Sequence, residues 1–78
     1  MYIYILKSEK DGSLYVGSTK ELNERIESHN KGFSLATRAK RPWVLAKVEE
    51  YASKSLALKR ERFLKTGKGR EILKNLIK

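Results

Sequence analysis

The chain has no cysteine and a single histidine among its 78 residues. Without cysteine it can form neither disulfide bonds nor zinc sites built on thiolates. One histidine is too few for a histidine-rich zinc site. Nothing in this composition requires an oxidising compartment, and the expected location is the cytoplasm.

A long hydrophobic run is also missing. The apolar start, MYIYIL, is followed at once by Lys7 and has neither the length of a signal-peptide core nor a small-residue cleavage site. No stretch approaches the roughly 20 apolar residues of a membrane span. We therefore expect one soluble domain over residues 1–78, too small for a large substrate pocket because a chain of this size hides only about 60% of its surface on folding.

Acidic residues are few compared with basic ones. The chain carries 18 Lys plus Arg against 9 Asp plus Glu, for a net charge of +9. Such a surface attracts polyanions, and nucleic acid is the first candidate. Structural RNA and anionic membrane surfaces fit the same balance, so the charge indicates a class of partner and says nothing about catalysis.

The first elements predicted are two antiparallel strands, over residues 2–8 and 13–17. Aromatic and β-branched residues fill them, and the loop between them ends in an Asp-Gly pair, which is typical of hairpins. A four-residue loop places Leu6 opposite Tyr15, with Tyr4 as the diagonal neighbour of Tyr15 on the same face. The two phenols are therefore expected to converge.

A helix is predicted next, over about residues 19–31. Ser18 and Glu21 have the spacing of a capping box, and Gly32 can adopt the left-handed conformation that ends a helix. On this helix Arg25 and His29 lie at one edge of the apolar stripe, so both should point toward the sheet.

The remainder predicts a basic loop, a strand and two helices. Either Ser53 or Ser55 can cap the first of these helices. The predicted ranges are 33–42 for the loop, 43–51 for the strand, and 55–66 and 69–77 for the helices. The fold class is α/β, a three-stranded antiparallel sheet with flanking helices in the order β-β-α-β-α-α.

Two tripeptides on the paired strands, YIY (Tyr2 to Tyr4) and YVG (Tyr15 to Gly17), resemble the two motifs of the GIY-YIG nuclease superfamily. The likeness is to its small single-domain bacterial members and covers nearly the whole chain. Tyr2 replaces the usual glycine and Val16 the usual isoleucine. Each tripeptide alone is a weak signal.

Further residues match the family's pattern downstream. Arg25 and His29 match its helix, Glu61 matches its metal-binding glutamate, and Asn75 loosely matches a supporting amide. The resemblance implies hydrolysis of DNA phosphodiesters with one divalent cation, Mg²⁺ or Mn²⁺. Periodicity does not select Glu61, which falls at the margin of the apolar stripe of its helix.

The resemblance also implies roles for these side chains. Tyr4 is the leading candidate for general base and Tyr15 for binding the water or phosphate, although the two roles can be exchanged. Arg25 would stabilise the phosphate in the transition state, and its charge, with that of the metal, would lower the pKa of the base. Glu61 would hold the cation, and His29 would relay or orient a proton.

Other cations are candidates for contacts to phosphates that carry no sequence information. No helix is available to read bases, so we expect selectivity for the shape of branched, flapped or damaged DNA, or specificity supplied by a partner protein. The protein is expected to be a monomer or a weak homodimer. The alternative is a non-catalytic DNA- or RNA-binding module on the same scaffold. The candidate phosphate contacts are Arg38, Lys40, Arg41, Lys65, Lys68 and Arg70.

Overall fold

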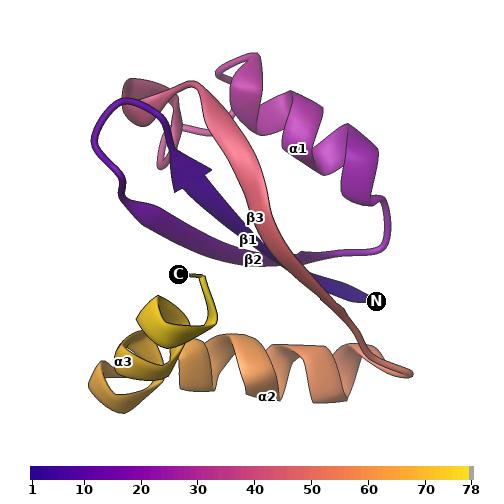
Figure 1. Cartoon of the computed structure of the whole chain (residues 1–78). Coiled ribbons are helices and arrows are strands. Elements are labelled where there is room, and N and C mark those ends of the chain that lie inside the picture. The colour runs from indigo at the N-terminus through magenta and orange to yellow at the C-terminus, as the bar shows by residue number, and fades with distance from the viewer. Residues whose placement is uncertain (78) are drawn as a thin grey trace.

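The computed structural model describes residues 1–77, which form a three-stranded antiparallel sheet and three α-helices (Figure 1). The predicted α/β class and element order are confirmed. The elements are β1 (Tyr2–Ser8), β2 (Leu14–Thr19), α1 (Leu22–Asn30), a short 3-10 helix η1 (Arg38–Lys40), β3 (Trp43–Glu50), α2 (Lys54–Leu64) and α3 (Gly67–Leu76).

The sheet has the order β2-β1-β3, so β1 is central and β2 is an edge strand. The hairpin register is the predicted one, with Leu6 opposite Tyr15 and Tyr4 opposite Gly17. Gly12 closes the turn with a φ of 77°, a conformation that glycine adopts without the steric cost of a Cβ. Tyr4 and Tyr15 are therefore diagonal neighbours on one face.

Helices cover both faces of the sheet. In Figure 1, α1 lies on one side of the strands and α2 and α3 on the other. Because strand side chains alternate between faces, the core divides into two clusters. The α1 face contains the buried residues Tyr4, Leu6 and Trp43. The face toward α2 and α3 contains Ile3, Ile5, Val16, Ala57, Leu64 and Leu73.

The predicted start of α1 was wrong. Ser18 belongs to β2, and α1 begins only at Leu22, where Glu21 occupies the N-cap position without a side-chain cap. The C-terminal prediction is confirmed, since Gly32 has a φ of 82°. Of the two candidate caps for α2, Ser53 is the one that accepts the Leu56 amide.

The loop before β3 contains a short helical turn, the 3-10 helix η1, which the sequence pattern did not predict. Between residues 1 and 77, none of the helices has both the length and the apolar character needed to cross a membrane.

Candidate active site

The Tyr4 hydroxyl is the hub of a polar cluster on the α1 face. It lies 2.9 Å from Nε2 of His29 and accepts a hydrogen bond from Nε of Arg25 at 3.4 Å. Tyr4 is 1% exposed. Both helix residues thus point toward the sheet as predicted, and Arg25 reaches the phenol while remaining largely exposed.

Gly17 makes room for the Tyr4 ring. A Cβ at this position would collide with the Tyr4 hydroxyl and with the ring carbon that bears it. Glycine is therefore required here because the ring lies directly across the backbone of β2. This close approach explains why the second tripeptide ends in glycine, a point that the sequence did not reveal.

His29 is held at its other nitrogen by Thr37. Nδ1 of His29 lies 2.8 Å from Oγ1 of Thr37, and both residues are almost fully buried. The Thr37 carbonyl accepts the indole N–H of Trp43 at 2.8 Å, which anchors the loop beneath the histidine. Sequence reasoning missed Thr37, since it lies in a loop without periodicity.

Burial and charge keep the histidine neutral. Burial lowers the pKa of His29 below its usual 6.5, and the nearby Arg25 charge lowers it further. The imidazole is therefore uncharged at neutral pH. An uncharged imidazole has one nitrogen free to accept a proton.

The phenol of Tyr4 responds mainly to burial. Burial raises its pKa above 10.0, whereas the hydrogen bond and charge of Arg25 act to lower it without offsetting the burial. Arg25 therefore favours the ionised phenol, as expected, but without the charge of a metal its effect does not outweigh burial. In the protein alone, Tyr4 keeps its proton at neutral pH.

Tyr15 completes the aromatic cluster. Its ring centroid lies 6.4 Å from that of Tyr4 and 5.0 Å from that of His29, in an edge-on arrangement with the imidazole. Unlike Tyr4 it is only half-buried, and it lines a cavity beside β2. It is therefore the more accessible phenol of the pair.

Glu61 approaches β2 from the opposite side of the sheet. Oε1 accepts a hydrogen bond from Oγ of Ser18 at 2.7 Å, and Oε2 accepts one from Nζ of Lys65 at 2.9 Å. Ser18 follows Gly17 directly, so the carboxylate and the Tyr4 phenol flank neighbouring residues of the edge strand. The negative charge of Glu61 contributes to the raised pKa of Tyr4, which places the two groups within electrostatic reach.

The Glu61 carboxylate is ionised at neutral pH. Burial acts to raise its pKa, but the hydrogen bonds from Lys65 and Ser18 outweigh burial and lower it. Its side chain is only 19% exposed. The contact with Ser18, which sequence reasoning assigned to a helix cap, orients one carboxylate oxygen at the strand edge.

A divalent cation fits these residues if one protein carboxylate holds it and water or substrate phosphates supply the other ligands. Residues 1–77 contain no cluster of three acidic, histidine or cysteine side chains that could enclose a metal. Mg²⁺ does not need such a cage, because it commonly keeps several waters and binds one or two carboxylates plus substrate phosphates. Glu61 supplies a single oriented, ionised carboxylate of this kind.

A cavity of about 660 Å³ runs beside β2, between this strand and the C-terminal helices. Leu14, Val16, Leu64 and Leu73 contribute apolar lining. Its four cations come from three parts of the chain: Lys40 from η1, Lys65 from the C-cap of α2, and Arg70 and Lys74 from α3. The structure thus brings together three of the six predicted phosphate contacts and adds Lys74, which sequence reasoning missed.

The other predicted residues lie elsewhere. Arg38 and Arg41 are exposed at η1, where Nε of Arg41 donates to the Arg38 carbonyl at 2.7 Å. Lys68 is exposed on α3. Asn75 is also exposed on α3, and no hydrogen bond within residues 1–77 connects it to the Tyr4 cluster or to Glu61. The loose match for Asn75 gains no structural support.

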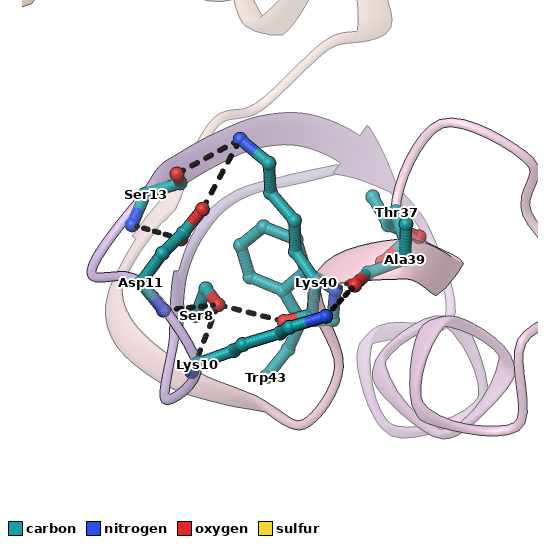
Figure 2. Close-up of polar contacts among 8 residues, drawn as sticks. All are labelled: Ser8, Lys10, Asp11, Ser13, Thr37, Ala39, Lys40 and Trp43. Atoms are coloured by element: carbon teal, nitrogen blue, oxygen red, sulfur yellow. Dashed lines mark hydrogen bonds and ion pairs between the residues drawn. The ribbon is translucent and has the colours of Figure 1, made fainter.

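Lys40 also binds side chains of the turn between β1 and β2. Figure 2 shows its ammonium group between Asp11, at 3.4 Å, and the Ser13 hydroxyl, at 3.0 Å. Hydrogen bonds from Ser13 lower the pKa of Asp11 to about 2, so this carboxylate is charged at neutral pH. The Ser8 hydroxyl donates to the Lys40 carbonyl at 2.7 Å. These contacts join the turn to η1 and partly neutralise Lys40.

Comparisons with known proteins identify the family of this domain. The model of the GIY-YIG catalytic domain matches residues 1–75. The UPF0213 proteins of Staphylococcus aureus strains Mu3 and Mu50 are 47% identical over 66 residues, which cover 83% of this chain and 79% of each relative. A solution NMR structure of the UPF0213 protein BH0048 from Bacillus halodurans matches with a TM-score of 0.59 and 33% identity, covering 96% of this chain and 82% of that one.

The fold and the matched motifs define a small nuclease-type α/β domain. The chain belongs to the GIY-YIG family, as the match over nearly its whole length shows. The expected relationship to small bacterial members of the family is confirmed by the UPF0213 relatives.

Proposed function

We propose that this protein is a divalent-metal-dependent endonuclease that hydrolyses phosphodiester bonds in DNA and selects its substrate by shape. The observation that carries the proposal is the convergence of the Tyr4 phenol, Arg25 and His29 on one side of β2 with Glu61 on the other. Packing alone does not require a buried phenol to meet both a guanidinium and an imidazole, since hydroxyl groups in cores need only one partner.

The proposed base is Tyr4, acting together with His29. Arg25 donates to the phenol oxygen, which leaves the phenol proton free to point at Nε2 of the neutral His29. As the attacking water transfers a proton to the phenol oxygen, the original phenol proton passes to Nε2. This relay does not require a free phenolate, and it therefore accommodates the raised pKa of Tyr4.

The Arg25 guanidinium has further N–H groups that could donate to the phosphate. Only Nε contacts Tyr4, so the terminal nitrogens of the guanidinium can donate to the non-bridging oxygens as phosphorus becomes five-coordinate. Arg25 remains charged throughout, since its hydrogen bond to Tyr4 raises the pKa of the guanidinium still further. Tyr15, the more exposed of the two phenols, would bind the attacking water or a phosphate oxygen.

Glu61 is the proposed ligand of Mg²⁺ or Mn²⁺, with Ser18 holding the carboxylate in place. The bound cation would stabilise the charge that develops on the leaving oxygen. The exposed cations of η1 and α3 would contact flanking phosphates without reading bases.

Cleavage of a panel of linear, flapped and branched DNA, with Mn²⁺ or Mg²⁺ and with EDTA, tests the proposal. Metal-dependent cleavage should disappear in Tyr4→Phe and Glu61→Gln, while both variants stay folded. Binding of the same substrates without cleavage under any of these conditions would instead favour the non-catalytic module, which the basic cavity alone would support.

A further inference from the structure

Lys65 pairs with Glu61 and also lines the cavity beside β2. Its Nζ lies 2.9 Å from Oε2 of Glu61, the oxygen that Ser18 does not occupy. The same side chain lines the cavity beside β2, together with Arg70 and Lys74. Lys65 therefore lies next to both the proposed metal ligand and the basic cavity beside β2.

The ion pair with Glu61 is of a kind that exchanges partners easily. It joins residues four apart on one helix, and the Lys65 side chain is 50% exposed. Exposed pairs of this spacing are weak because water competes for the charges and the long lysine stem is flexible. Here the lysine is the exposed partner, whereas the Glu61 side chain is only 19% exposed. A divalent cation at the carboxylate would compete with the ammonium for the same oxygen.

The chain contains a second lysine–glutamate ion pair of the same spacing, and this pair does not line the cavity. Lys31, the C-cap residue of α1, lies 3.0 Å from Glu27, four residues earlier, and their exposures are 58% and 63%. Neither residue lines the cavity. Any property that follows only from an exposed pair of this spacing should be shared by Lys31, whereas a property of the cavity should not.

We propose that Lys65 exchanges partners when the metal binds, leaving Glu61 and contacting a phosphate of the nucleic acid held in the cavity beside β2. The inference rests on the proposed function, since it requires a cation at Glu61. In the metal-free protein Lys65 neutralises the carboxylate. In the loaded protein its charge is delivered to the substrate, so metal binding and nucleic-acid binding reinforce each other.

The exchange has a measurable signature in salt dependence. Each phosphate that a lysine neutralises steepens the fall of log affinity with log salt by about 0.9 for duplex DNA and about 0.7 for single strands. Adding metal should therefore steepen the slope more in a protein with Lys65 than in one without it. By reciprocity, DNA should strengthen metal binding more when Lys65 is present.

The experiment uses the full chain in a Tyr4→Phe background, so that the DNA stays intact. Four proteins are compared, namely this parent and its Lys65→Met, Lys31→Met and Glu61→Gln derivatives. Binding of a labelled flapped DNA is measured by fluorescence anisotropy over a salt series, with Mn²⁺ and with EDTA. Bound Mn²⁺ is counted separately in the presence of the DNA by the loss of the free-ion EPR signal. Circular dichroism checks that each variant is folded.

If Lys65 exchanges partners, Glu61→Gln should lose the bound Mn²⁺. Adding Mn²⁺ should steepen the slope of log affinity against log salt by about 0.7–0.9 less in Lys65→Met than in the parent. Lys31→Met should behave like the parent. If Glu61→Gln loses Mn²⁺ but Lys65→Met and Lys31→Met show the same change of slope, the exchange is refuted and the proposed metal site stands. If Glu61→Gln binds Mn²⁺ as the parent does, or if no Mn²⁺ binds at all, the proposed metal site is wrong and the exchange falls with it.

Discussion

Replacing Gly17 by alanine should displace the proposed general base. The added methyl group would occupy space that the Tyr4 hydroxyl and its ring carbon now fill, so the ring has to move away from β2. Forcing an extra methyl into a packed site typically costs about 1–3 kcal/mol. For a domain of this size each kcal/mol lowers the melting temperature by about 4–8 °C.

The same displacement should affect cleavage more strongly than stability. Moving the phenol by about 1 Å breaks its alignment with Arg25 and His29, and a misplacement of this size can cost about 100-fold in rate. The assay pairs thermal unfolding with single-turnover cleavage of a flapped DNA. Gly67→Ala is the control, because a Cβ there meets nothing within 4 Å.

A double-mutant cycle distinguishes a clash with the Tyr4 ring from a general loss of stability when β2 is substituted. In a Tyr4→Ala background the ring is gone, so Gly17→Ala should cost much less stability than it does in the wild type. Equal costs in the two backgrounds, or wild-type cleavage by Gly17→Ala, would refute the steric argument.

The remaining predictions concern the groups around the phenol. Thr37→Val leaves Nδ1 of His29 buried without a partner and should lower the free energy of unfolding by about 1–3 kcal/mol, measured in urea. Arg25→Ala should raise the barrier to cleavage by about 3–4 kcal/mol without unfolding the protein, since one preorganised donor to the phosphate is lost. A rate close to that of the wild type would remove Arg25 from the site. The buried His29 has a folded pKa below 6.5, so the unfolded chain binds more protons as the pH falls below 6.5. Its contribution to stability should be complete above 6.5 and should decline below that pH, and His29→Gln should abolish this decline in urea unfolding. Cleavage should fall at more acidic pH, around the folded-state pKa of His29, because a protonated imidazole cannot accept the phenol proton.

Local rules predicted the hairpin and the convergence of the two phenols well. The Asp-Gly turn and the period of two determine the register, so Tyr4 and Tyr15 had to share a face. The helical period likewise brought Arg25 and His29 to the sheet. These predictions depend on residues close together in the chain, where geometry leaves few alternatives.

Contacts between distant segments could not be predicted in this way. Ser18 has the spacing of a helix cap, but its hydroxyl donates to Glu61, 43 residues away, and it remains in β2. The hydrogen bond of Thr37 to His29 depends on how an aperiodic loop folds back under α1. Glu61 itself lies at the margin of its helix's apolar stripe, where periodicity does not distinguish a ligand from a solvated charge.

The most direct test of the central claim is cleavage of flapped DNA with Mn²⁺ by the wild type, Tyr4→Phe and Glu61→Gln, each checked for folding by circular dichroism. The site predicts EDTA-sensitive cleavage by the wild type and none above background by either variant. Metal-dependent cleavage by Tyr4→Phe or Glu61→Gln at the wild-type rate would contradict it.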